Sequence, residues 1–90
     1  MELKDTITLM QSEDYKERFI AEYWQTKIRY EKLKAFNTKI EAAQMTEGMK
    51  NRVEEPKHDC PAFLLRDQQR TMGEYLHFLE VRAVIESIKL

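Results

Sequence analysis

Cysteine, proline and glycine are scarce in this sequence, which has one, two and two of them in 90 residues. The single cysteine, Cys60, excludes an internal disulfide framework and a cysteine-rich metal site, and it is typical of a reducing compartment. The common residues are Leu, Glu, Lys, Ala, Met and Gln, which favour long helices over turn-rich β folds. We therefore expect an all-α protein.

Long apolar runs and an excess of one charge are also missing. No run approaches the ~20 apolar residues that a membrane-spanning helix needs, and the N-terminus lacks the basic and apolar regions of a secretory signal. The formal net charge is -1 with 34% charged residues, so no overall field attracts the chain to nucleic acid or acidic lipid. We expect a cytoplasmic protein with no membrane partner, whose partners are recognised locally.

Helix signals predict a single helical domain over residues 1–90, built on a long antiparallel two-helix hairpin. Ser12 precedes two acidic residues, as an N-cap does, and Gly48 is a natural helix stop. The first helix is therefore expected over residues 12–47, with a length of about 50 Å at ~1.5 Å per residue.

The rest of the chain completes the predicted hairpin. A connecting loop is expected over residues 48–60, where charges and a proline interrupt any periodicity. Pro61 suits the first position of a helix because its missing N–H costs nothing there, so the second helix is expected over residues 61–88. Residues 1–11 form an N-terminal extension.

Each predicted helix has a seam with alternating steps of four and three residues, the spacing of coiled-coil-like packing. On the first helix the seam consists of Phe19, Tyr23, Thr26, Tyr30, Leu33, Asn37 and Ile40. On the second it consists of Leu65, Gln69, Met72, Leu76, Leu79, Ala83, Glu86 and Leu90. The two seams are expected to face each other.

Further apolar stripes lie beside these seams and exceed what one partner helix can bury. They consist of Ile20, Trp24 and Ile28 on the first helix and of Phe78, Val81, Ile85 and Ile88 on the second. Either residues 1–11 fold back over one stripe through Leu3, Ile7 and Met10, or a homodimer or higher oligomer buries both. The N-terminal segment is compatible with a helix turn and with a short strand. Both stripes are candidate interfaces with a second copy or with a target.

Candidate catalytic and metal-binding groups are few. His58, Asp59 and Cys60 are three possible ligands in a row, but no second pair is present to complete a zinc site. His77 is expected at the surface, and Cys60 is expected near the cap of the second helix. We expect no enzyme activity, no cofactor and no metal.

The middle of the first helix is locally basic, because five bases between residues 27 and 39 face one acid, Glu31. Candidate contacts to an anion or to nucleic acid are Lys27, Arg29, Lys32, Lys34 and Arg82. The alternative, which we favour, is a solvated face balanced by acids of the second helix. Those acids are Glu74, Glu80 and Glu86.

The stretch DYKERFIAEYWQTKIRYEKLKAF over residues 14–36 resembles the opening helix of small proteins encoded by gut bacteriophages and prophages, often labelled as related to a crAss-like phage protein. The second helix carries a similar pattern. Its matching residues are Cys60-Pro61, Leu64-Leu65, Gln68-Gln69, Met72, Glu74-Tyr75-Leu76, Leu79-Glu80, Arg82-Ala83 and Ile85-Glu86.

That resemblance implies a phage accessory protein in the cytoplasm of a bacterial host cell, of the kind that inhibits host defence. The first expectation is a non-enzymatic anti-CRISPR protein that blocks a Cas nuclease by protein–protein contact. The alternatives are an oligomeric sponge that sequesters an immune nucleotide signal, closed on a phosphate by Arg29, Lys32 or Arg82, and a structural component of phage assembly.

Overall fold

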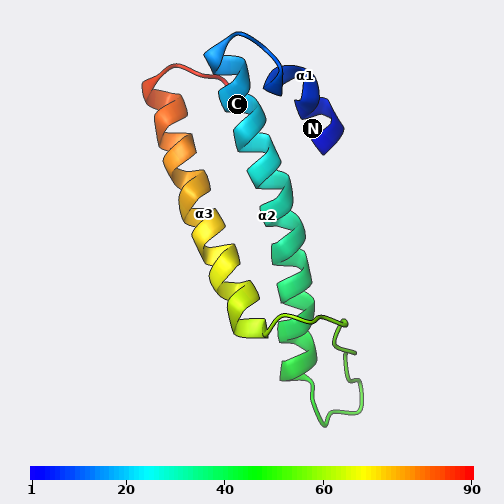
Figure 1. The fold of residues 1–90 in the computed structure, drawn as a ribbon. Helices are drawn as coiled ribbons and strands as arrows, with labels where there is room; N and C mark the ends of the chain where they lie inside the picture. Colours follow the sequence, from blue (N-terminus) through cyan, green and yellow to red (C-terminus); the bar gives the residue numbers. More distant parts are fainter.

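Three α-helices and one short 3-10 helix make up the protein in a computed structural model that describes all 90 residues. The 3-10 helix η1 (Leu3–Asp5) leads into α1 (Thr6–Met10), and the long α2 spans Tyr15–Met45. Helix α3 (Ala62–Ile85) returns antiparallel beside α2 (Figure 1). The structure contains no strand, so the predicted all-α hairpin is confirmed. None of its helices is both long and apolar enough to cross a membrane.

Helix α2 begins three residues later than the sequence indicated. Asp14 is its N-cap, since the Asp14 carboxylate accepts a hydrogen bond from the Lys16 N–H at 2.9 Å. The Ser12 hydroxyl instead accepts from the Asp14 N–H at 3.0 Å. The assignment of Ser12 as N-cap was therefore wrong, because the nearby carboxylate, a stronger acceptor, takes the free N–H of the first turn.

The C-terminal end of α3 turns back on the helix. Ser87 has φ +56°, and the Ile88 N–H donates to the Ala83 carbonyl at 2.8 Å, as in a Schellman motif. The turn places Ile88 in the core, where it is 7% exposed. The assignment of Ile88 to an outer interface stripe was wrong, because the helix ends at Ile85 and the periodicity of the stripe ends with it.

Replacing Ser87 by Gly is expected to raise the free energy of unfolding by about 0.5–1 kcal/mol. A side chain with a Cβ is strained in the left-handed region, whereas glycine adopts it freely. Urea denaturation of S87G and of the wild type measures the difference. The matched control is Ser87→Ala, which keeps the Cβ; an equal gain from this variant would contradict the explanation.

The core lies at the end of the hairpin where both termini are found (Figure 1). Its buried members are Phe19, Tyr23, Leu76, Leu79 and Ala83 from the two predicted seams, together with Ile88. The Tyr23 hydroxyl donates to Glu80 Oε2 at 2.8 Å, and burial together with this carboxylate raises the pKa of Tyr23 to about 12. The phenol therefore stays protonated as a donor at neutral pH, and it ties α2 to α3.

Helix α1 packs against α2 on the side away from α3 (Figure 1). Thr6 is 1% exposed, and its hydroxyl accepts a hydrogen bond from Gln25 Nε2 at 3.0 Å. The N-terminal segment is thus helical and folds back, which is one of the two arrangements that the sequence allowed. It covers little apolar surface of its own, since Ile7 and Met10 stay about half exposed.

The loop between α2 and α3 is held by polar contacts. The Thr46 hydroxyl accepts from the Val53 N–H at 3.0 Å. The imidazole of His58 lies 2.6 Å from the Cys60 carbonyl oxygen and edge-on to Phe36. The hydrogen bond with that carbonyl raises the pKa of His58. His58 therefore anchors the loop in this structure.

Candidate functional site

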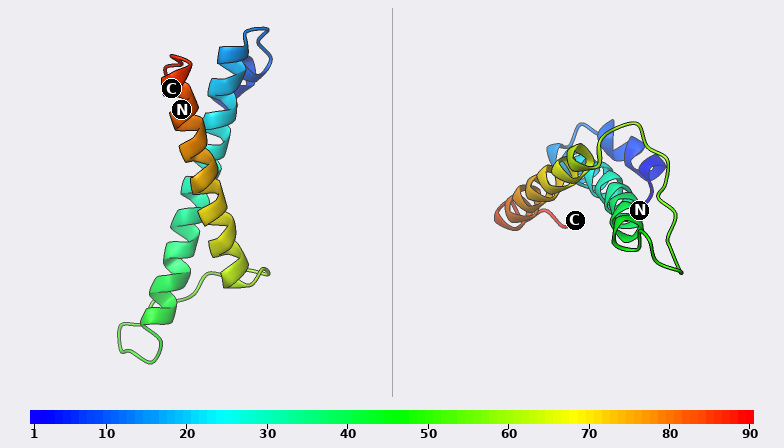
Figure 2. Two further views of the ribbon diagram at one scale, coloured as in Figure 1. Left: turned by 90° about the vertical axis from the view of Figure 1, so that its left-hand side faces the viewer. Right: turned by 90° about the horizontal axis from the view of Figure 1, so that it is seen from below.

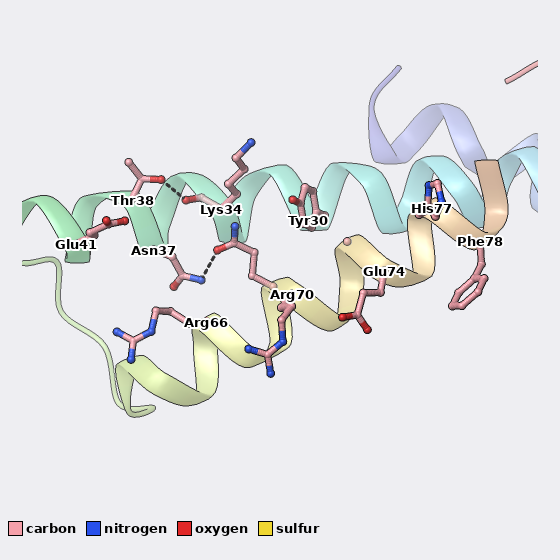
Figure 3. A pocket seen from close by; sticks show the side chains of 12 residues that line it. Tyr30, Lys34, Asn37, Thr38, Glu41, Arg66, Arg70, Glu74, His77 and Phe78 are labelled. Carbon is pink, nitrogen blue, oxygen red and sulfur yellow. Dashed lines mark hydrogen bonds between the residues drawn. The ribbon is translucent and has the colours of Figure 1, made fainter. Parts of the chain in front are cut away.

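A groove of about 910 Å³ lies between α2 and α3 (Figure 3). The two helices cross at an angle (Figure 2), and one residue of the groove, Tyr30, also packs against the core. Its walls comprise Tyr30, Lys34, Asn37, Thr38 and Glu41 of α2, and Arg66, Gln69, Arg70, Gly73, Glu74, His77 and Phe78 of α3. The volume is in the range of small-molecule sites, ≈ 300–1,000 Å³.

Polar residues in the seams explain why the helices leave this space. Asn37 and Gln69 occupy seam positions where a coiled coil has apolar residues, so no core fills the gap. Gly73 lets a tyrosine ring approach the backbone of α3, because a Cβ there would lie 3.2 Å from Tyr30 Cε1. The groove therefore results from Asn37, Gln69 and Gly73 at the contact between α2 and α3.

Asn37 is the buried polar residue of the groove, with 7% exposure. Its Nδ2 donates to the Leu65 carbonyl at 3.0 Å and to Gln69 Oε1 at 2.8 Å (Figure 3). Its Oδ1 is buried and has no hydrogen-bond partner. A buried acceptor without a partner costs about 1–3 kcal/mol, so this amide is an expensive feature of the site.

Three cations and two carboxylates belong to the groove: Lys34, Arg66, Arg70, Glu41 and Glu74. Arg70 forms an exposed ion pair with Asp67 at 3.1 Å, whereas Lys34 and Arg66 form none. Figure 3 shows that the three cationic side chains extend in different directions from the two helices. A bound anion would therefore have to draw them together, which flexible exposed side chains permit.

Of the predicted anion contacts, only Lys34 lies in the groove. Lys27 pairs with Glu31 at 3.2 Å, and Arg29 and Lys32 are exposed outside the groove. Arg66 and Arg70 were missed, because the search for basic clusters followed one helix. Their four-residue spacing on α3, opposite Lys34 in the hairpin, was the available signal.

Arg82, another predicted anion contact, is engaged within the chain. It pairs with Glu86 at 3.2 Å and lies 5.0 Å from the centre of the Phe19 ring. Glu80 accepts from Tyr23, and no ion pair joins α2 to α3. The structure therefore shows no ion pair between the bases of α2 and Glu74, Glu80 or Glu86, whereas Arg29, Lys32 and Lys34 are exposed, as on the solvated face that the sequence analysis favoured.

The predicted interface stripes differ in exposure. Ile20, Trp24 and Ile28 are half-buried, and the first two pack against the core. Phe78, Val81 and Ile85 are 65%, 44% and 75% exposed. Val84, which the sequence analysis did not include, is 81% exposed beside them. The stripe on α3 is therefore largely exposed to solvent, whereas the stripe on α2 packs largely within the chain.

The structure contains no group of three or more His, Cys, Asp or Glu side chains placed to hold a metal ion. His58 lies against Glu55 and the Cys60 carbonyl, while the Cys60 side chain is exposed. The side chains of His58, Asp59 and Cys60 therefore do not form a shared metal site.

Substituting leucine for both Asn37 and Gln69 is expected to raise the free energy of unfolding by about 1 kcal/mol. Replacing both partners of a buried hydrogen bond by apolar groups removes the unpaired acceptor without creating another. The single variant Asn37→Ala is expected to lose about 1–3 kcal/mol, because Gln69 then loses its partner. Urea denaturation of both variants measures this, and a double variant less stable than N37A would contradict it.

The fold and the groove define a class: a small all-helical hairpin protein with an open, mixed-charge groove between its long helices. The chain belongs to the Sequestin family, whose family model matches residues 13–85. The match includes all of α2 and α3 and leaves out α1. No curated protein and no solved structure matches the chain.

Proposed function

We propose that this protein is a non-enzymatic sponge that binds a nucleotide signal of bacterial immunity in the groove between α2 and α3. The family name, Sequestin, supports a sequestering role. The observation that carries the proposal is the groove of about 910 Å³, which is lined by Lys34, Arg66 and Arg70. A groove of this volume with several cations suits a small anionic ligand.

The groove residues suit the parts of a nucleotide. Arg66, Arg70 and Lys34 supply donors for phosphate oxygens, which guanidinium groups bind in a two-pronged geometry. Tyr30 offers an aromatic face on which a base stacks. Gln69, whose Oε1 accepts from Asn37, offers its amide N–H groups to the edge of a base. The ligand is therefore an anion that carries both phosphate groups and an aromatic base.

The surroundings of the candidate catalytic groups support the proposal of binding without chemical change. His77 is the only histidine of the groove, and no hydrogen bond orients it. Catalysis by such a base requires a partner group that fixes its proton and direction. We therefore propose that the bound signal is held and released unchanged.

The test uses a filtrate from bacteria whose defence system has been triggered. The filtrate is incubated with the purified protein, passed through a membrane that retains the protein, and added to the effector that the signal activates. Loss of activation, restored by heating the retained protein, is the expected result. A filtrate that keeps its activity, or loses it without recovery on heating, would overturn the proposal.

A second candidate is an inhibitor of a Cas nuclease, which the resemblance to phage proteins favours. The exposed face formed by Phe78, Val81 and Ile85 supports it, because apolar patches of this kind are typical of protein interfaces. In this case the protein would lower DNA cleavage by the purified nuclease and leave the filtrate active. A third candidate, a phage assembly component, would leave both unaffected and would be found in particles.

A further inference from the structure

The imidazole of His58 lies between two hydrogen-bond acceptors in the loop that joins α2 to α3. Its Nδ1 is 2.6 Å from the Cys60 carbonyl oxygen, and its Nε2 is 3.2 Å from Glu55 Oε2. A carbonyl and an ionised carboxylate both accept hydrogen bonds and donate none. Both ring nitrogens must therefore carry a proton for both contacts to be hydrogen bonds.

A neutral imidazole has one N–H and can satisfy only one of these acceptors. The Cys60 carbonyl is fixed in the backbone, whereas the Glu55 side chain is 41% exposed and can turn to water. The single proton of the neutral ring is therefore expected on Nδ1, where the carbonyl holds it. The lone pair on Nε2 would then face a carboxylate oxygen, so loss of the Nε2 proton to solvent breaks the contact with Glu55.

The groups around the ring favour its charged form. The charged groups that face it are Glu55 and Asp59, both acidic, and α2 contributes the neutral ring of Phe36, whose centre lies 6.1 Å from that of the imidazole. The hydrogen bond with the Cys60 carbonyl, supported by the contact with Glu55, raises the pKa of His58, and partial burial opposes this rise. Protonation therefore stabilises the folded loop. This stabilisation is fully present below the ordinary histidine value of about 6.5 and is lost as the pH rises through the raised value.

The position of His58 connects three parts of the chain. Its ring lies edge-on to Phe36 of α2, its Nε2 contacts the loop at Glu55, and its Nδ1 contacts Cys60, which comes two residues before α3 begins. The groove residue Arg66 belongs to the first turns of α3. The imidazolium therefore holds the residues that lead into this part of α3 next to α2.

We propose that His58 is a proton-dependent clip on this loop. With both ring nitrogens protonated, it joins the Glu55 carboxylate to the Cys60 carbonyl and holds the start of α3 beside α2. When the Nε2 proton leaves for solvent, Glu55 is released and the start of α3 becomes more mobile. The proposal does not depend on the proposed function, because it rests on contacts of the loop outside the groove.

Nitrogen-15 NMR of the imidazole in the full chain measures which ring nitrogen carries a proton at each pH. Both nitrogens of His58 are expected to be protonated at low pH, and above the transition only Nδ1 is expected to keep its proton. The transition is expected at a pH above the ordinary histidine value of about 6.5. A neutral ring with its proton on Nε2, or a transition at or below the ordinary value, would overturn the proposal.

Hydrogen exchange measures the release of α3, because the Leu64 and Leu65 N–H groups donate to the Pro61 carbonyl in its first turn. Their protection factors are expected to fall roughly two- to five-fold as the pH rises through the transition, the range of an exposed ion pair.

Glu55→Gln supplies the decisive comparison. Its side-chain amide can donate to the neutral Nε2 of His58, so the protection of Leu64 and Leu65 is expected to stay constant across the same pH range. The matched control, Glu54→Gln, removes the same charge from an exposed neighbour and is expected to behave as the wild type. Constant protection in the wild type, or an equal fall in the wild type and E55Q, would overturn the proposal.

Discussion

Replacing Arg66 and Arg70 together by Glu is expected to weaken retention of the nucleotide signal by about 100-fold or more. Each substitution removes a phosphate donor and adds a repelling charge, and charge-assisted hydrogen bonds to phosphate contribute about 1.5–3 kcal/mol each. Both side chains are exposed, so the fold is expected to survive. Equilibrium dialysis against the purified signal measures the change.

The matched control for this double variant is Arg29→Glu with Lys32→Glu. It makes the same total change in charge on exposed positions of α2 that lie outside the groove. Retention is expected to fall no more than a few-fold, through the weaker overall attraction of an anion. If the control lost as much retention as the groove variant, the binding site would belong to the basic stretch of α2 instead.

Replacing Leu79 by Ala is expected to cost about 2–5 kcal/mol of the free energy of unfolding. Leu79 is 1% exposed in the core cluster, and truncation there loses buried apolar surface and leaves a cavity. A domain of this size has roughly 5–10 kcal/mol of stability in total, so the melting temperature is expected to drop by about 10 °C or more. Thermal unfolding followed by circular dichroism measures it.

Met45→Ala is the control for this loss, because Met45 is apolar and helical but 73% exposed. Its effect is expected to lie within about 0.5 kcal/mol of zero. A similar destabilisation by both substitutions would show that the cluster around Leu79 does not carry the stability of the fold.

The long helices and their seams could be predicted because the spacing of apolar residues indicates which face of a helix is buried. Phe19, Tyr23, Leu76 and Leu79 were placed in the seam by spacing alone, and all four are buried. Local capping was harder to predict. Whether Ser12 or Asp14 begins α2 depends on which oxygen reaches a free N–H, and both residues suit that position.

The groove could not be predicted, since it depends on two polar seam residues meeting across the hairpin. Asn37 and Gln69 each interrupt a seam in the sequence, but the pairing between them is fixed only by the loop length and the register of α3. Ile88 was misplaced for a related reason. The turn at Ser87 has a left-handed residue that is not glycine, and no periodicity reveals such a turn.

The most direct measurement of the central claim is the mass and amount of nucleotide released by heating protein that has been loaded with an activated-host filtrate. The account predicts release of the signal with its mass unchanged, in a fixed ratio to the wild-type protein, and little release from the Arg66→Glu, Arg70→Glu variant. Release of an altered molecule, or equal release from the wild type and the variant, would contradict sequestration in this groove.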